Sequence, residues 1–426
     1  MRVLNPRPCF LLVYRIPDKL KCEVDRQIDQ LLQDGKIRPS CSPYAHPIVC
    51  VAKSNGEIRL CTDLRYVNSG TISDAFPMPR TDDLLMSMSN ASYTSKLDAV
   101  SGYWQIPMRE SDIPKTAFVT HRGLFEWLVM PFGLKTASNT FQRAMNDILR
   151  SHTSYAHAYI DDTAVYSRTW DEHLTHLDNV LSEFENVGMT LRLSKCLWAL
   201  PKVQFIGHDV GSGQRTVIQS KVEAIKIVPE PRNKKLLRSF LGMCAFYRSY
   251  IANYSDIALP LTEMTKNRQS TNFTFNDVQR AAFLLLKDKL CKCTALYSPM
   301  PGKPFIIRTD ASGVAVGASV SQVDDQNHER PIAFASAKLT EVQQRWSAIE
   351  SEAYAVIFAL KKFDVIVFGS PIVLYSDHNP LQYLAACLPK SAKLTRWSLS
   401  LTRYDITVRH IKGSENVVAD CLSRCI

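Results

Sequence analysis

The sequence predicts a mixed α+β part followed by a separate α/β unit. At 426 residues the chain is too long for one ordinary domain, since domains hold roughly 100–200 residues. Hairpin-type strands and helices are mixed over residues 22–166, and residues 220–290 are mostly helical in pattern. From Pro304 to the end, strand and helix patterns alternate, which is typical of an α/β unit.

The composition is that of a folded, water-soluble protein. Hydrophobic residues make up 46% and charged residues 22%, a balance that excludes a largely disordered chain. No apolar run approaches the ~18 residues that a membrane-spanning helix needs. The 12 cysteines are scattered without a Cys-x-x-Cys pair. We therefore expect an intracellular protein with buried free thiols and no structural zinc site.

The positive charge is concentrated in the middle of the chain. Residues 191–300 hold 17 Lys and Arg against 7 Asp and Glu. The counts are 20 against 22 in residues 1–190, and 14 against 12 in residues 301–426. A focused basic segment fits a track for a polyanion, because Lys and Arg displace condensed counterions from phosphates. A solvated helical surface is the alternative, and charge alone does not decide between them.

The first elements are a helix and a hairpin. Apolar spacing predicts a helix over 22–32 that ends at Gly35. Residues 47–52 and 58–62 read as strands, and the Asn-Gly in the connection between them is a hairpin signal. A further helix begins at Thr81, with two acids in its first turn.

The next elements surround a pair of acids. Residues 93–100 predict a strand and residues 136–149 a helix. Residues 157–166 form two apolar β-type runs on either side of a two-acid turn. The pattern therefore predicts a hairpin whose tip presents Asp161 and Asp162.

Context separates this acid pair from two others in the chain. Asp82-Asp83 opens a helix and Asp324-Asp325 lies in a polar loop. Asp161-Asp162 lies between apolar strands, with no Lys or Arg after it until Arg168, so its repulsion needs a compensating cation. Asp98 ends another predicted strand. Three converging carboxylates would bind two Mg²⁺ ions about 3.5–4 Å apart, an arrangement that serves phosphoryl transfer.

A second set of acids occupies the C-terminal unit. Asp310 and Asp377 each follow a predicted strand, and Asp420 lies near the end of the chain. Glu350 and Glu352 lie near the start of an amphipathic helix, and both flank its apolar face, so periodicity leaves the choice between them open. Acids at strand ends and at a helix start can converge at one sheet edge, again as a two-metal site.

These residues carry a resemblance to a known family. Tyr159-Ile160-Asp161-Asp162 resembles the Tyr-x-Asp-Asp box of reverse transcriptases. Residues 95–106 resemble the first catalytic motif of gypsy-type LTR retrotransposon polymerases. Further blocks similar to that family are residues 59–68, 130–137, 140–143 and 205–208, and, for its ribonuclease H domain, residues 308–312, 375–381 and 416–424.

The resemblance implies a fold and a domain order. The expected fold is an α+β right-hand polymerase, with fingers, palm, thumb and an antiparallel palm sheet, followed by an α/β ribonuclease H-like domain. Residues 1–205 would form fingers and palm, residues 206–300 the basic thumb and connection, and residues 301–426 the ribonuclease H-like domain. The expected location is cytoplasmic, with a virus-like particle or the nucleus as alternatives.

The resemblance also implies roles for single residues in the polymerase site. Asp98, Asp161 and Asp162 would hold two Mg²⁺ ions, with Mn²⁺ as the alternative ion. The remaining roles are triphosphate binding by Lys53 and Arg59, exclusion of a ribose 2′-hydroxyl by Tyr103, and lining of the nucleotide pocket by Phe132 and Gly133.

For the second site, the family places its glutamate directly before a residue-x-Ala step, which selects Glu352 before Ala353-Tyr354-Ala355. Asp310, Glu352, Asp377 and Asp420 would then hold two further Mg²⁺ ions. His410 is expected either to assist product release or to be an ordinary surface histidine.

The expected function is an RNA- and DNA-directed DNA polymerase with ribonuclease H activity. Its partners would be an RNA template, a DNA primer, the RNA–DNA hybrid and deoxynucleoside triphosphates, with no membrane; the oligomeric state stays open. One alternative is an inactive or domesticated copy that only binds nucleic acid. Another is a general DNA polymerase or a retroviral-type enzyme, against which the second set of acids and the Phe132-Gly133 block argue.

Overall fold

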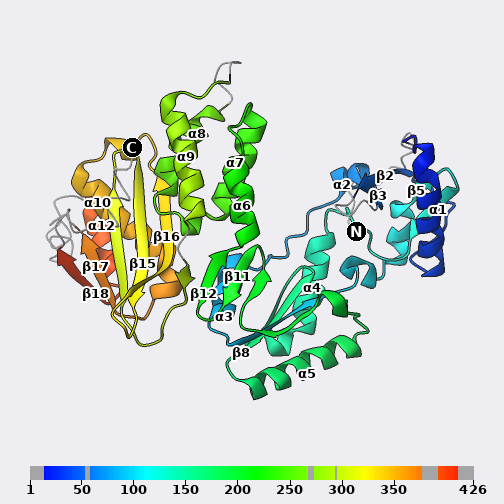
Figure 1. Cartoon of the computed structure of the whole chain (residues 1–426), viewed down its shortest axis with the longest axis horizontal. Coiled ribbons are helices and arrows are strands. Elements are labelled where there is room, and N and C mark those ends of the chain that lie inside the picture. The colour runs from blue at the N-terminus through cyan, green and yellow to red at the C-terminus, as the bar shows by residue number, and fades with distance from the viewer. Residues whose placement is uncertain (1–13, 53–57, 267–272, 293–294, 377–391, 411–426) are drawn as a thin grey trace. The chain divides into compact units, whose positions relative to one another are not determined.

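The computed structural model divides into two compact units, Met1–Ile206 and Gly207–Ile426 (Figure 1). None of the described helices is both long and apolar enough to cross a membrane. The structure describes residues 14–52, 58–266, 273–292, 295–376 and 392–410.

A five-stranded sheet forms the first part of unit one, in the order β1-β6-β5-β2-β3. The predicted hairpin is confirmed, since β2 and β3 pair antiparallel. Helix α1 buries Val24, Ile28 and Leu31 in one cluster with residues of this sheet. The elements are α1 (Asp18–Gln33), β1 (Ile37–Pro39), β2 (His46–Ala52), β3 (Ile58–Thr62), β5 (Phe118–Thr120) and β6 (Gly123–Trp127).

A four-stranded sheet in the order β7-β8-β4-β9 carries the first acid set. The predicted hairpin and the strand over 93–100 are both confirmed. Phe141 and Met145 of α4 and Phe184 of α5 lie in one buried cluster with residues of this sheet. The strands are β4 (Tyr93–Asp98), β7 (Ala156–Tyr159), β8 (Asp162–Ser167), β9 (Leu197–Leu200) and the following β10 (Val203–Phe205); the helices are α2 (Arg65–Gly70), α3 (Thr81–Ser89), α4 (Ala137–Ile148) and α5 (Trp170–Asn186).

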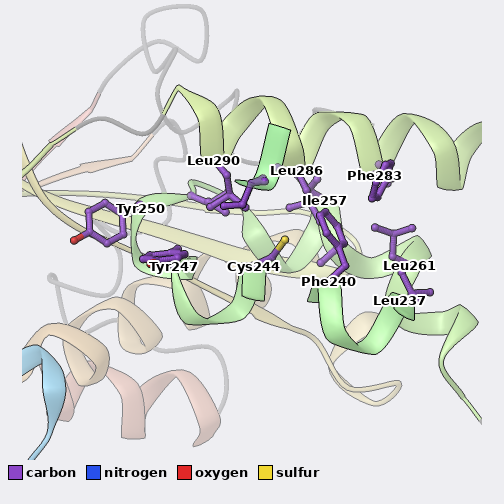
Figure 2. Packing of buried hydrophobic residues seen from close by; sticks show 14 of the residues in the cluster. Leu237, Phe240, Cys244, Tyr247, Tyr250, Ile257, Leu261, Phe283, Leu286 and Leu290 are labelled. Carbon is purple, nitrogen blue, oxygen red and sulfur yellow. The ribbon is translucent and has the colours of Figure 1, made fainter. Parts of the chain in front are cut away.

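Unit two begins with a small antiparallel sheet and four helices, so the helical pattern over 220–290 is confirmed. Figure 2 shows side chains of α7 facing those of α9, and the Phe240 and Phe283 rings lie 4.7 Å apart between centroids. The elements are β11 (His208–Gly211), β12 (Gln214–Val217), β13 (Leu296–Tyr297), α6 (Gln219–Ile227), α7 (Lys234–Phe246), α8 (Tyr254–Met264) and α9 (Asp277–Cys291).

The last part of unit two is a five-stranded sheet in the order β16-β15-β14-β17-β18. Its first three strands are antiparallel, whereas β17 and β18 run parallel to β14. Helix α10 packs on this sheet through Val356, Leu360 and Phe363. The elements are β14 (Phe305–Ala311), β15 (Ala315–Val323), β16 (Glu329–Lys338), α10 (Ala348–Val367), β17 (Ile372–Ser376), α12 (Ala392–Leu401) and β18 (Ile406–His410).

The domain boundaries expected from the sequence, 1–205, 206–300 and 301–426, stay a prediction.

The described cysteines are free thiols as expected, but only Cys196 and Cys244 among them are buried, so the expectation of general burial is wrong. Several cysteines lie in apolar runs that form half-exposed strands, such as Cys50 and Cys61.

Asp256 of α8 is a half-buried carboxylate whose ionisation should affect stability. Its Oδ1 atom has no hydrogen-bond partner among the described residues, and Ser312 hydrogen-bonds its side chain. Burial raises the pKa of Asp256 from 3.8 to about 6. Since the folded state holds this proton more tightly than the unfolded state, stability falls as pH rises between these two values and then levels off.

We expect Asp256→Asn to remove this pH dependence, because an amide cannot ionise. The variant should gain stability over the wild type as pH rises from 4 to 6.5, measured by denaturant midpoints across that range. Asp277→Asn, at a fully exposed carboxylate in the same unit, is the matched control and should follow the wild type. A constant difference between Asp256→Asn and the wild type at every pH would show that Asp256 does not titrate in this range.

Candidate active sites

Strand pairing brings the first three predicted acids together. Asp98 at the end of β4 is the direct antiparallel partner of Asp162 at the start of β8. Such partners have Cα atoms about 4.5–5.5 Å apart. Tyr159 of β7 pairs with the same Asp162, so Ile160 and Asp161 form the two-residue turn of the β7–β8 hairpin. Strand pairing thus brings Asp98 and Asp162 together with Asp161 in the adjoining turn, and the metal-binding role of the three acids stays a prediction.

The turn that carries Asp161 has an unusual backbone. Ile160 has a φ of +53°, which is rare for a β-branched side chain. The buried Gln142 of α4 fixes this turn: it accepts a hydrogen bond from the Ile160 N–H at 2.8 Å and donates one to the Ala158 carbonyl at 2.9 Å. Strain of this kind persists only where surrounding groups hold it. Sequence patterns did not identify this role for Gln142, which stood out only as part of the block 140–143 and as a polar residue inside a predicted helix.

The three carboxylates influence one another electrostatically. Burial raises the pKa of Asp161, and the neighbouring charges of Asp162 and Asp98 raise it further. The buried Oδ1 atom of Asp161 has no hydrogen-bond partner among the described residues. An unsatisfied, buried carboxylate oxygen beside two others is a set of hard oxygen donors, which suits Mg²⁺.

The carboxylates are not arranged as a finished metal site. Within the described ranges, no three His, Cys, Asp or Glu side chains lie in positions to hold one ion. Asp162 instead forms an ion pair with Lys96, whose Nζ lies 2.9 Å from Asp162 Oδ1. The donor chemistry therefore fits a divalent cation, but Asp162 would have to exchange partners.

A groove of about 460 Å³ joins these acids to predicted substrate-binding residues. Asp98 and Asp161 line it together with Arg59 of β3 and Phe132. The Arg59 guanidinium carbon lies 5.5 Å from the centroid of the Phe132 ring. A cation and an aromatic ring beside paired carboxylates could receive the phosphates and the base of a nucleotide.

The same groove contains cations that sequence reasoning missed. Arg192 and Lys195 line it, and the Arg192 backbone N–H donates a hydrogen bond of 2.8 Å to the Asp98 carbonyl. The sequence indicated them only through the excess of Lys and Arg over residues 191–300, which was assigned to the basic thumb and connection of residues 206–300. Lys53, also predicted here, lies outside the described residues.

Tyr103 lies beside the groove residue Phe132. The two rings are 5.2 Å apart between centroids, and the Tyr103 hydroxyl lies 3.0 Å from Ser138 Oγ. Burial raises the pKa of Tyr103, so the hydroxyl stays neutral at physiological pH. Gly133 follows Phe132 with a φ of +94°, and Asn68 donates a hydrogen bond of 2.7 Å to its carbonyl. This turn directs the aromatic side chain, and glycine suits its left-handed conformation.

Gly102 provides space for Asp161. A Cβ atom added at Gly102 would lie 3.1 Å from Asp161 Oδ1 and 2.8 Å from the Phe141 ring. The close approach of this backbone to the turn therefore requires glycine. In the sequence, Gly102 stands out only as part of the motif at residues 95–106.

The second predicted site is partly described. Asp310 of β14 and Glu352 of α10 are both buried, with 7% and 6% of their surface exposed. Glu352 Oε1 accepts a hydrogen bond of 3.3 Å from the Ala311 backbone N–H, which places it at the end of β14 beside Asp310. β17 ends at Ser376, and Asp377 and Asp420 lie outside the described residues. His410 is the last residue of β18.

The choice between Glu350 and Glu352 has a structural explanation. Glu350 accepts the Ser347 backbone N–H at 3.2 Å, while Ser347 Oγ accepts the Glu350 N–H, so the two form the capping box of α10. Glu350 is thus used at the helix start, whereas Glu352 faces β14. The geometry supports Glu352, and its catalytic role stays a prediction.

Two segments of the chain match known protein families in sequence. Residues 51–210 match the family model "Reverse transcriptase (RNA-dependent DNA polymerase)". Residues 300–404 match "RNase H-like domain found in reverse transcriptase".

Similar curated proteins are Pol polyproteins of transposons. The chain is 40% identical to that of transposon opus and 34% identical to that of transposon gypsy, both from Drosophila melanogaster, over 100% of its length. It spans 44% and 42% of those polyproteins, less than half of each.

Solved structures share the fold. The chain superposes on a foamy viral protease-reverse transcriptase in complex with double-stranded DNA with a TM-score of 0.83, over 96% of this chain and 72% of the other, at 24% identity. The TM-score is 0.74 for a foamy viral protease-reverse transcriptase in complex with an RNA/DNA hybrid, over 96% of this chain and 55% of the other, also at 24% identity. The predicted fold class, a right-hand polymerase followed by a ribonuclease H-like domain, is confirmed.

Proposed function

The chain belongs to the reverse transcriptase–ribonuclease H region of gypsy-type LTR-retrotransposon Pol polyproteins, and from this premise we propose that it copies RNA into DNA and degrades the copied RNA. The polymerase would also accept a DNA template. The observation that supports this proposal most strongly is the pairing of Asp98 with Asp162 across β4 and β8, with the buried Asp161 Oδ1 in the adjoining turn. A cluster of this kind costs folding energy unless a cation is bound, so it needs a functional reason.

In the polymerase site, this chain's residues would position the reactants. Arg59 and Phe132 line the groove beside the acids, so Arg59 would bind the triphosphate and Phe132 would contact the nucleotide. The primer 3′-hydroxyl would attack the α-phosphate, and pyrophosphate would leave. Mg²⁺ held by Asp98, Asp161 and Asp162 would supply positive charge to the phosphate oxygens. Positioning then lowers the barrier by aligning the two reacting groups.

In the second site, Asp310 and Glu352 would hold Mg²⁺ together with Asp377 and Asp420. The proposed reaction is hydrolysis of the RNA strand of an RNA–DNA hybrid. Burial of the two described carboxylates supports a role in binding a cation, because a buried carboxylate needs a compensating charge.

The proposed partners are an RNA template, a DNA primer, the hybrid and deoxynucleoside triphosphates. Two structural neighbours are described as complexes with double-stranded DNA and with an RNA/DNA hybrid, which supports nucleic-acid binding here. The Lys and Arg residues of the basic segment 191–300 would bind the phosphates of the duplex backbone. Binding should therefore weaken with salt and depend little on base sequence.

Primer extension on an RNA template with Mg²⁺ and deoxynucleotides tests the proposal. Extension supports the polymerase, whereas hybrid binding without extension would support the alternative of an inactive or domesticated copy. All seven expected acids of the two sites are present in the sequence, which argues against an inactive copy, because a decaying copy would soon lose one of them.

We expect Tyr103→Ala to increase incorporation of ribonucleotides. The Tyr103 ring lies against Phe132 at the groove, so its removal should leave room for a 2′-hydroxyl. The measurement is the ratio of kcat/KM values for a deoxynucleotide and its ribonucleotide, which should fall at least about tenfold, equivalent to roughly 1.4 kcal/mol. Tyr93→Ala is the control, because this half-buried tyrosine lies at the start of β4, at the opposite end of that strand from Asp98. Unchanged discrimination in Tyr103→Ala would remove the proposed selective role.

A further inference from the structure

Lys96 lies on the same face of β4 as Asp98. Side chains two residues apart in a strand point to the same side. Lys96 pairs with Ala164 and Asp98 pairs with Asp162, so Lys96 is the diagonal neighbour of Asp162 across the two strands. Its long side chain spans that diagonal, and its Nζ lies 2.9 Å from Asp162 Oδ1.

The ammonium group has a second acceptor. Lys96 Nζ also donates a hydrogen bond of 3.3 Å to the carbonyl of Gln204, in β10. The Lys96 side chain is 20% exposed and that of Asp162 is 34% exposed, so the ion pair is partly shielded from water. Partial shielding makes the attraction stronger than that of a fully exposed pair.

The positive charge of Lys96 lies beside Asp162, one of three carboxylates that repel one another. Asp98 and Asp162 both raise the pKa of Asp161, which shows that the three carboxylates repel one another. A cation that pairs with Asp162 offsets part of this repulsion. Lys96 Nζ also occupies Asp162 Oδ1, an oxygen that a divalent ion would need. With this ion pair in place, the described carboxylates do not form a finished metal site.

We propose that Lys96 is a built-in counter-cation of the polymerase site, which holds Asp162 before metal binds and competes with the metal for that carboxylate. This inference rests on the proposed metal-dependent function. When Asp162 turns to a metal ion, the flexible lysine keeps its bond to the Gln204 carbonyl. Lys96 is therefore a positioning residue that sets how readily the site binds metal.

Removal of the charge should strengthen metal binding. We expect Lys96→Met to be less stable than the wild type without metal and to need at least about threefold less Mg²⁺ for half of the metal-induced rise in unfolding temperature. The readout uses the full chain without nucleic acid, so it does not depend on activity. All proteins carry Glu352→Gln, which weakens the contribution of the second site. Lys96→Arg keeps the charge and should resemble the wild type.

The control variants separate a local effect from general destabilisation. In an Asp162→Asn background, the Lys96→Met change should no longer alter the Mg²⁺ midpoint, because the competing pair is already gone. Lys115→Met removes a similarly exposed lysine, which pairs with Asp112 at 2.5 Å, and should leave the Mg²⁺ midpoint unchanged. If Lys96→Met does not fold, Lys96→Gln removes the same charge with a polar side chain and should shift the midpoint in the same direction.

The failures of the two proposals are distinguishable. If the Glu352→Gln protein with Lys96 intact binds no Mg²⁺ in this assay, the result would contradict the proposed metal site and this inference with it. A clear Mg²⁺ effect with the same midpoint in wild type and Lys96→Met would overturn only the role of Lys96. A midpoint shift that persists in the Asp162→Asn background would do the same.

Discussion

Asp161→Asn should abolish DNA synthesis and leave RNA cleavage intact. Asn has nearly the same shape as Asp, but it lacks the negative charge that the buried Oδ1 position offers to a cation. Loss of a metal contact is worth several kcal/mol of transition-state stabilisation, so the rate of synthesis should fall at least about a thousandfold. The measurement is single-nucleotide extension of a primer on an RNA template.

A matched substitution tests whether the effect is local. Asp171→Asn, at an acid in the first turn of α5 of the same unit, should retain synthesis. Circular dichroism and the unfolding temperature should show that Asp161→Asn is folded. If a folded Asp161→Asn lost RNA cleavage as well, the assignment of two separate sites would be wrong.

Glu352→Gln should have the reverse effect and remove RNA cleavage while DNA synthesis continues. Glu352 is buried beside Asp310, and its Oε1 accepts the Ala311 N–H, so Gln can occupy the same space without the charge. We expect at least about a hundredfold loss of cleavage of the RNA strand in a preformed RNA–DNA hybrid. Asp377→Asn is expected to give the same separation of activities.

Glu350→Gln is the control, because it changes the same type of residue on the same helix. Glu350 closes the capping box with Ser347, so this substitution should cost at most about 1 kcal/mol of stability and leave cleavage unchanged. Loss of cleavage in Glu350→Gln with normal cleavage in Glu352→Gln would reverse the assignment.

The local patterns in the sequence predicted the elements that carry the first site. The apolar runs around Asp161 and Asp162 and the strand that ends at Asp98 form a hairpin and its neighbour as expected. The positive φ of Ile160 was not predictable, because a β-branched residue is disfavoured in that conformation and only contacts from α4 hold it. Departures from local rules of this kind are expected at functional sites.

The ion pair between Lys96 and Asp162 could not be predicted from the sequence. The acid pair needs a compensating cation, yet the sequence around it contains no nearby Lys or Arg. Lys96 comes from β4, and only the register of β4 against β8 places it beside Asp162. Register depends on the whole sheet, so a single-strand pattern cannot identify this pair.

The sequence contains a further pattern that distinguishes Glu350 from Glu352. Periodicity places both Glu350 and Glu352 beside the apolar face of the helix. Ser347-Ala348-Ile349-Glu350 is itself a Ser-x-x-Glu pattern, which is typical of a capping box and assigns Glu350 to the helix start. The pattern would have left Glu352 as the acid available to the sheet.

The most direct test of the two-site function is one reaction with both strands labelled. The substrate is a DNA primer annealed to an RNA template, with Mg²⁺ and deoxynucleotides, and the proteins are the wild type, Asp161→Asn and Glu352→Gln. We predict that the wild type extends the primer and cleaves the template, and that each variant loses only one of these activities. A wild-type protein that binds the hybrid in a salt-dependent way but neither extends nor cleaves it would contradict the proposal and favour a copy that only binds nucleic acid.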